Sequence, residues 1–160
     1  MRARKSGTIV NLSSAGGFQA LPGFSSYAAS KFALEGLSES LAQEVSDFGI
    51  RVIIVEPGAF RTNFGNAAEK PQTELPEGYA GTTVDLVMKR LMNSSGEQIG
   101  NPRKAAARMY QYITGAKEAG HAHRLVMGTD AINLMQAKVH RVSGAIALAR
   151  DAEQVNSTAF

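Results

Sequence analysis

The sequence predicts an α/β fold in which short parallel strands alternate with helices. Two β-branched apolar runs, residues 8–12 and 51–55, flank a segment of helical periodicity at residues 25–48. A strand, a helix and a second strand at this spacing form a βαβ unit, whose two strands are parallel. A third apolar run, residues 124–127, is followed by another helical segment over residues 129–150. These observations together indicate a layered α/β fold with a parallel sheet.

The segments around this unit fit the same alternation. Residues 13–23 are rich in serine and glycine and predict a loop after the first strand. The helix that follows should end at Gly49, a residue type common just past helix ends. Residues 59–80 combine prolines and glycines and predict a long irregular segment, which in a compact domain usually has a function. The apolar face expected on the long helix consists of Ala28, Phe32, Leu34, Leu37, Leu41 and Val45.

Two more helices are predicted before the third strand. They span residues 82–93 and 102–118, and the second begins with Asn101 as N-cap and Pro102 in its first turn. Three strands are few for a sheet of this class, and an apolar strand so near the start of the chain lacks a neighbour. We therefore expect missing N-terminal sequence, so that residues 1–160 form a single partial domain.

The composition argues against several classes of function. The net charge of +3 comes from scattered side chains and only 7% of residues are aromatic, so no nucleic-acid partner is expected. There is no cysteine, and no carboxylate stands at a convincing ligand spacing from His121 and His123, so no metal site is expected either. No apolar run approaches the ~20 residues that a membrane span requires. We expect no membrane span and a cytoplasmic location.

Tyr27 and Lys31 lie four residues apart at the start of the long predicted helix. Side chains at this spacing share a helix face, so the phenol and the ammonium can point into the same space. A nearby cation favours the ionised phenolate, the form in which a phenol acts as a general base. Ser14 follows the first strand, at the edge where open α/β sheets bind ligands. The sequence thus predicts that Ser14, Tyr27 and Lys31 meet at one place.

These residues belong to three longer segments, residues 8–14 (TIVNLSS), 27–31 (YAASK) and 51–62 (RVIIVEPGAFRT). Together the segments resemble the classical short-chain dehydrogenase/reductase family, in which the interval from Ser14 to Tyr27 and the Pro-Gly-x-x-x-Thr pattern are both common. The close resemblance covers about residues 6–64. It implies the C-terminal part of a Rossmann-like, doubly wound parallel sheet, with three short strands, flanking helices and a missing N-terminal half.

The resemblance also implies an activity and three catalytic residues. The enzyme would be an NAD(P)-dependent oxidoreductase that interconverts an alcohol and a ketone or aldehyde by hydride transfer. Tyr27 would act as the general acid/base at the substrate oxygen, and Ser14 would hydrogen-bond and orient that oxygen. Lys31 would favour the phenolate of Tyr27 and bind the ribose hydroxyls of the nicotinamide. The complete enzyme would act on a small alcohol or carbonyl substrate and would form a homo-oligomer.

Further binding residues are implied by the segment after the second strand. Pro57, Gly58 and Thr62 would hold the nicotinamide carboxamide and the nearby phosphate, together with Tyr27 and Lys31. Phe60 and Phe64 would contact the substrate beside Ser14, inside a segment that closes over it. The cofactor would be either NAD or NADP. The choice between them is left open, because the residues that select one of them lie in the part of the family pattern that this sequence lacks.

The sequence departs from the family pattern at its front. It contains neither a Gly-x-Gly-x-x-Gly nor a Gly-x-x-x-x-Gly-Lys motif, the two loops that most often hold phosphates. One alternative is therefore a truncated, catalytically inactive fragment. A second alternative is an epimerase or dehydratase of the extended family, which would also use the Tyr-x-x-x-Lys pair. The Pro-Gly-x-x-x-Thr pattern and the short C-terminal tail argue against this second alternative.

Overall fold

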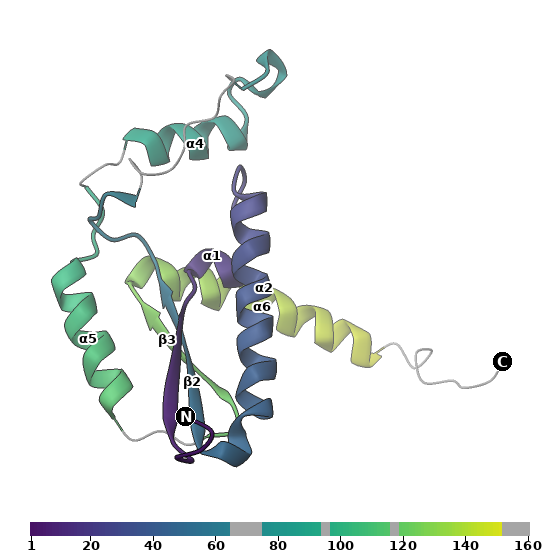
Figure 1. The fold of residues 1–160 in the computed structure, drawn as a ribbon. Coiled ribbons are helices and arrows are strands. Elements are labelled where there is room, and N and C mark those ends of the chain that lie inside the picture. Colours follow the sequence, from purple (N-terminus) through teal and green to yellow (C-terminus); the bar gives the residue numbers. More distant parts are fainter. Residues whose placement is uncertain (65–74, 94–96, 116–118, 152–160) are drawn as a thin grey trace.

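The computed structural model describes residues 1–64, 75–93, 97–115 and 119–151, and it confirms the predicted parallel α/β fold (Figure 1). The sheet contains β1 (Gly7–Leu12), β2 (Ile50–Pro57) and β3 (Ala122–Met127), all parallel, in the order β1-β2-β3. Leu12 is paired with Val55 and Pro57 with Met127, so the three strands end close together at one edge. We call this edge the carboxyl edge.

The helices fall close to the predicted positions, with two differences. The described helices are α1 (Ala15–Phe18), α2 (Ser25–Glu44), α4 (Thr83–Asn93), α5 (Pro102–Thr114) and α6 (Thr129–Asp151), with 3-10 turns η1 (Ser46–Phe48) and η2 (Glu77–Tyr79). The short α1 lies in the predicted loop and forms because the Ser14 side chain caps its first turn. The α2 helix ends at Glu44, because the chain tightens into η1 before Gly49 adopts a left-handed φ of 61°.

One predicted strand boundary differs from the structure, and two predicted segments lie partly outside the described residues. The third strand begins at Ala122, two residues earlier than predicted, so His123 is a strand residue rather than a loop residue. Residues 65–74 of the predicted irregular segment and residues 116–118 of the predicted helix lie outside the described residues. Within the described part of the chain, no helix is both long and apolar enough to cross a membrane.

The main apolar core lies between the sheet and α5. Figure 1 shows α5 and α2 on opposite sides of the sheet. The buried centre of the core consists of Ile53, Val55, Leu125 and Met127, and the residues packed against it are Phe60, Ala105, Met109, Tyr112 and Ile113. The α5 members recur at helical spacing, so a single helix face covers the ends of β2 and β3. This packing holds the β2 and β3 ends of the carboxyl edge in place from the α5 side of the sheet.

The face of α2 that meets the sheet coincides only in part with the predicted apolar face, because Ala28 is buried and Leu34, Leu41 and Val45 are partly buried. Its buried residues are Ala28, Glu35, Ser38 and Ala42, whereas Phe32 and Leu37 remain 39% and 59% exposed. The prediction was wrong at Phe32 and Leu37, because the facing side of the sheet carries polar groups. Asn11, for example, donates its side-chain amide to the Ser38 hydroxyl at 2.8 Å. A helix packed there has to supply hydrogen-bonding partners, which large apolar side chains cannot do.

The first strand is also less buried than predicted. It lies at the edge of the three-stranded sheet, and Val10 and Leu12 are 39% and 58% exposed. Both pair in register with core residues of β2, Ile53 and Val55, so they point to the same side of the sheet as the α5 core. Among the described residues, nothing buries them there. The β2 strand, in contrast, is fully buried over Val52–Glu56, as predicted.

Candidate active site

The carboxyl edge brings together the end of β1 and the beginning of α2. Ser14 follows β1 and caps α1, where its Oγ accepts a hydrogen bond from the backbone N–H of Gly16 at 3.0 Å. Tyr27 and Lys31 lie in the first turns of α2, and both side chains are partly buried. The Ser13 backbone N–H donates to the Val55 carbonyl at 2.8 Å, which ties the serine loop to the end of β2.

Ser14 and Tyr27 face the same small volume beside Gly16. A Cβ atom placed on Gly16 would lie 3.4 Å from the Ser14 Oγ and 3.1 Å from Cε1 of the Tyr27 ring. The serine oxygen and the edge of the phenol ring are therefore both within 3.4 Å of one point in space. Two groups at this separation can contact a single small ligand, as the sequence pattern predicts for a shared substrate oxygen. The roles of the two residues stay a prediction.

Lys31 completes this arrangement from the next turn of α2. Its Nζ lies 5.8 Å from the centroid of the Tyr27 ring, within the range of a cation–π contact. The same Nζ donates a hydrogen bond to the Leu12 backbone carbonyl at 2.8 Å, which holds the ammonium against the end of β1. An ammonium has three donors, so two remain for other acceptors. The residues predicted as catalytic are thus brought together by the fold.

The two predicted substrate residues are in different surroundings. The Phe64 ring lies 6.0 Å from the Tyr27 ring in an edge-to-face arrangement, and Phe64 is 56% exposed. Phe60 instead packs against the apolar core beneath α5 and forms a bridge with Gly100. The fold therefore places Phe64 beside the phenol. Phe60 anchors the loop, which carries both phenylalanines, to the core.

The turn after β2 is held from two sides. Pro57 ends the strand, and the Gly58 N–H donates to the Met127 carbonyl at 2.8 Å. The next N–H, that of Ala59, donates to the Asp130 carboxylate at 2.7 Å, from the first turn of α6. Asp130 was not recognised from the sequence, although an acidic residue in a first helical turn after a strand is a recognisable signal.

Thr62 lies farther along the same loop and is exposed. Its Oγ1 accepts a long hydrogen bond, 3.3 Å, from the backbone N–H of Phe64. This bond orders the loop locally and leaves the hydroxyl hydrogen available to a ligand. Thr62 therefore has the exposure that its predicted role requires, and that role stays a prediction.

Replacing Gly58 with alanine is expected to destabilise the fold by about 1–3 kcal/mol. A methyl group at Gly58 would overlap both oxygens of the Asp130 carboxylate. Asp130→Ala alone should cost about 1–2 kcal/mol, because the Ala59 N–H loses its acceptor. In the double variant the overlap is gone, so its loss should be smaller than the sum of the single losses. Urea unfolding of the four proteins measures this coupling, and strict additivity would contradict the proposed overlap.

A second group of charged residues lies behind the serine loop, on the α2 side of the sheet. The Arg124 guanidinium contacts three carboxylates: Glu35 at 2.7 Å, Glu39 at 2.5 Å and Glu56. Glu35 and Glu56 are 5% and 0% exposed. Burial raises the pKa of Glu56 from 4.5 to about 7, and the adjacent Arg124 opposes that rise while Glu35 adds to it. We call these four side chains the Arg124 cluster.

The Arg124 cluster was not predicted from the sequence. One signal was present, because Glu35 stands four residues after Lys31 and eight after Tyr27 and so shares their helix face. Another was the charge of Arg124 and Glu56 within otherwise apolar strand segments, since buried charges are normally paired. The pairing itself could not be read from the sequence, because the partners come from α2, β2 and β3.

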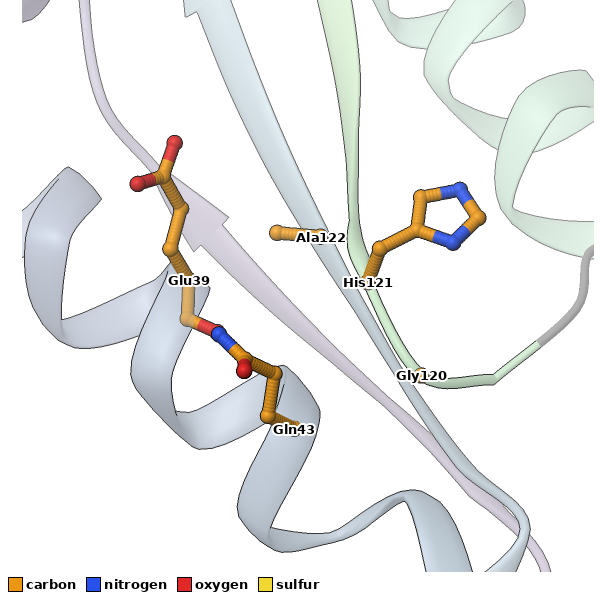
Figure 2. A pocket seen from close by; sticks show the side chains of 5 residues that line it. All are labelled: Glu39, Gln43, Gly120, His121 and Ala122. Atoms are coloured by element: carbon orange, nitrogen blue, oxygen red, sulfur yellow. The ribbon is translucent and has the colours of Figure 1, made fainter.

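A separate pocket of about 310 Å³ lies at the other end of the sheet. Glu39 and Gln43 line it from the second half of α2, and Gly120, His121 and Ala122 line it where β3 begins (Figure 2). None of these five residues is a predicted site residue. The pocket is polar and shallow and does not contain the hydroxyl, phenol and ammonium groups that meet at the carboxyl edge, so we place the candidate site at that edge.

The part of the chain that carries the candidate site matches a model of a known protein family. Residues 1–73 match the family model described as short chain dehydrogenase. The chain is 48% identical over 97 residues to "Oxidoreductase claN" of Passalora fulva, which covers 61% of this chain and 44% of that protein. It is 52% identical over 117 residues to "3-ketodihydrosphingosine reductase" of Bacteroides thetaiotaomicron, which covers 71% of this chain and 42% of that protein.

A solved structure extends the likeness over nearly the whole chain. The crystal structure of a short-chain dehydrogenase from Streptomyces avermitilis superposes with a TM-score of 0.76 at 38% identity, and covers 96% of this chain and 54% of that one. The chain thus spans about half the length of the relatives it matches. All three relatives carry names from the same class of redox enzyme.

Proposed function

The chain belongs to the short-chain dehydrogenase/reductase family, and on that premise we propose that it carries the catalytic groups of an oxidoreductase. The proposed reaction interconverts an alcohol and a ketone or aldehyde with NAD or NADP. One observation carries the proposal: the Ser14 Oγ and the Tyr27 ring edge lie within 3.4 Å of one point, with the Lys31 ammonium 5.8 Å from the same ring.

Each of the three side chains has a distinct task in the proposed reaction. In the direction of reduction, the Tyr27 hydroxyl donates its proton to the carbonyl oxygen as that oxygen becomes an alcohol; in oxidation the phenolate takes the proton back. The Ser14 hydroxyl donates a hydrogen bond to the same oxygen and stabilises the charge that develops there. The Lys31 ammonium lies beside the phenol ring and is itself held by the Leu12 carbonyl, from where it would bind the ribose of the cofactor.

The residues at the carboxyl edge fit the nicotinamide half of the cofactor. Lys31 retains two donors for ribose hydroxyls beyond its bond to the Leu12 carbonyl. Pro57 and Gly58 lie where β2 ends, and Thr62 lies farther along the same loop; we propose that these three residues contact the carboxamide and the nearby phosphate. When bound, the nicotinamide supplies the site that gives or accepts the hydride. The sequence holds no glycine-rich phosphate loop for the other half of the cofactor.

The remaining parts of the proposal rest on family membership. The substrate would be a small alcohol or carbonyl compound, and the exposed Phe64 ring beside Tyr27 would favour an apolar one. The complete enzyme would be a cytoplasmic homo-oligomer. The half-exposed Phe32 and Leu37 on the outer side of α2 provide apolar surface that subunit contact would bury.

Replacing Lys31 with methionine tests the proposal directly. Methionine keeps most of the length of the side chain but removes the ammonium, so the hydrogen bonds to the ribose are lost. Loss of a charged hydrogen bond should weaken NAD(P)H binding roughly tenfold or more. The dissociation constant is measured by nicotinamide fluorescence titration in a version of the enzyme that spans the full length of its relatives, with both NADH and NADPH. Turnover with a panel of secondary alcohols and ketones should fall as well.

Lys89→Met is the matched control, because Lys89 is a largely exposed lysine of α4 whose ammonium pairs with Asp85. It should leave both cofactor affinity and turnover within twofold. Unchanged affinity and turnover in Lys31→Met would refute the proposed site. An enzyme that binds NAD(P)H but turns over none of the panel would favour the catalytically inactive alternative.

A further inference from the structure

The helix face that carries the proposed catalytic pair continues inward to a buried carboxylate. Tyr27, Lys31 and Glu35 follow one another at intervals of four residues along α2, so their side chains share one side of the helix. Tyr27 and Lys31 are partly buried, whereas Glu35 is only 5% exposed. A buried carboxylate needs partners that compensate for the water it loses. Glu35 has two such partners, one at each carboxylate oxygen.

The first partner connects Glu35 to the serine loop. The Ser13 hydroxyl donates a hydrogen bond of 2.7 Å to Oε1 of Glu35, and Ser13 is 3% exposed. The Ser13 backbone N–H is held separately by the Val55 carbonyl at 2.8 Å. Ser13 is therefore fixed both through its backbone and through its side chain. Because Ser14 is the next residue, the direction in which its side chain leaves the backbone depends on how Ser13 is held.

The second partner holds Glu35 in place. Its other oxygen, Oε2, accepts a hydrogen bond of 2.7 Å from Arg124 on β3. Charge-assisted hydrogen bonds of this kind are stronger than neutral ones and hold a carboxylate in a defined orientation. Gly17 packs directly against the junction, because a methyl group there would overlap both Oε1 of Glu35 and the Ser13 hydroxyl. The space around the Ser13–Glu35 bond is thus closed.

We propose that Glu35 is a positioning residue for the reaction: it acts through Ser13 to set the Ser14 Oγ relative to the Tyr27 phenol, and Arg124 fixes Glu35 in turn. This inference rests on the proposed function, because it assigns a purpose to the placement of Ser14. The helix then determines the geometry of the site at two points. It carries the phenol itself, and through Glu35 it orients the hydroxyl that has to face that phenol.

Two single variants and their combination test this inference. Ser13→Ala removes the hydroxyl, and Glu35→Gln removes the charge that orients the carboxylate toward Arg124. Each should lower kcat by about tenfold while the KM for the nicotinamide cofactor stays within twofold, because Ser14 contacts the substrate oxygen and not the cofactor. Since both variants break the same connection, the double variant should be no slower than the slower single variant. kcat is expressed per cofactor-binding site in the full-length enzyme, so that misfolded protein does not count.

Glu39→Gln is the matched control. Glu39 lies on the same helix, is also bonded to Arg124, and is 55% exposed at its side chain. It should leave kcat and KM within twofold. If Glu35 only stabilised the fold, its loss would lower the midpoint of unfolding but not kcat per site. Glu35→Gln and Glu39→Gln would then differ only in how far each lowers that midpoint.

Three outcomes count against the inference. They are a wild-type kcat in Glu35→Gln, a wild-type kcat in Ser13→Ala, or a double variant slowed by the product of the two single effects. Should Glu35→Gln fail to fold, Ser13→Ala alone decides, because it removes one oxygen and leaves Glu35 paired with Arg124. These results are separable from the proposed function itself, which is judged by the loss of turnover when the Tyr27 hydroxyl is removed.

Discussion

Tyr27→Phe is expected to lower kcat by about 10²- to 10⁴-fold, the usual contribution of a positioned proton donor. Phenylalanine keeps the ring, and with it the edge-to-face contacts with Phe24 and Phe64 at 6.4 Å and 6.0 Å. Only the hydroxyl that would exchange a proton with the substrate is lost. The affinity for NAD(P)H should therefore stay within about twofold, because the Lys31 ammonium is untouched. Steady-state turnover and fluorescence titration on the full-length enzyme measure the two quantities.

Tyr110→Phe provides a matched control for this variant. Tyr110 lies on α5 and is 71% exposed, so removing its hydroxyl should change neither turnover nor cofactor affinity. If Tyr27→Phe retained wild-type turnover, the proposed general acid/base would be wrong. If it lost cofactor binding as well as turnover, the hydroxyl would be needed for cofactor binding or structure, and the kinetic loss could not be assigned to proton transfer.

Replacing Arg124 with methionine is expected to destabilise the folded protein by about 3–5 kcal/mol at pH 8. Methionine occupies a similar volume but leaves Glu56, which is fully buried, and Glu35 without their guanidinium partner. Breaking a buried ion pair costs more than the pair itself contributes, because an uncompensated charge remains in the interior. The midpoint of urea unfolding should fall accordingly.

The pH dependence of this loss has a definite sign. Burial raises the pKa of Glu56 to about 7 in the folded protein, compared with 4.5 as its ordinary value. The folded state therefore binds this proton more tightly than the unfolded state, so the stabilising contribution of the protonated group is complete below about pH 4.5 and is lost as the pH rises through 7. Without Arg124 the ionised form of Glu56 is still less favourable in the folded protein. Arg124→Met should therefore lower the free energy of unfolding more at pH 8 than at pH 5.5.

A second substitution tests whether Glu56 is the cause. In the Arg124→Met background, Glu56→Gln removes the buried charge, so the double variant should be more stable than Arg124→Met at pH 8. Its stability should also depend less on pH between 5.5 and 8. Equal losses for Arg124→Met at both pH values, or no recovery in the double variant, would contradict the assigned role of the Arg124 cluster.

The sequence predicted the fold where local pattern and burial agree. The apolar run of β2 is buried on both faces, so its composition alone identified it as a buried strand. The convergence of Ser14, Tyr27 and Lys31 was predictable because it depends only on helix periodicity and on where parallel strands end. These rules hold without knowledge of any tertiary contact, and the structure places all three side chains as they require.

The features that escaped prediction all depend on contacts between distant segments. Glu35 has the charge of an ordinary surface residue, and only its bonds to Ser13 and Arg124 explain why it is buried in place of the apolar Leu37. The family resemblance implies that Phe60 contacts the substrate, and that role stays a prediction. Its position against the core follows from the packing of α5, which is about 40 residues away in sequence.

The four-residue spacing on α2 constrains the number of residues between Tyr27 and Glu35 more strongly than it constrains their identity. An α-helix rotates by about 100° per residue, so deleting or inserting one residue between Tyr27 and Glu35 would move the phenol and the buried carboxylate onto different sides of the cylinder. Substitutions at exposed positions within this stretch, such as Ala33, and just after it, such as Gly36, leave that rotational phase unchanged. Homologous genes should therefore vary in sequence across this stretch while keeping its residue count constant.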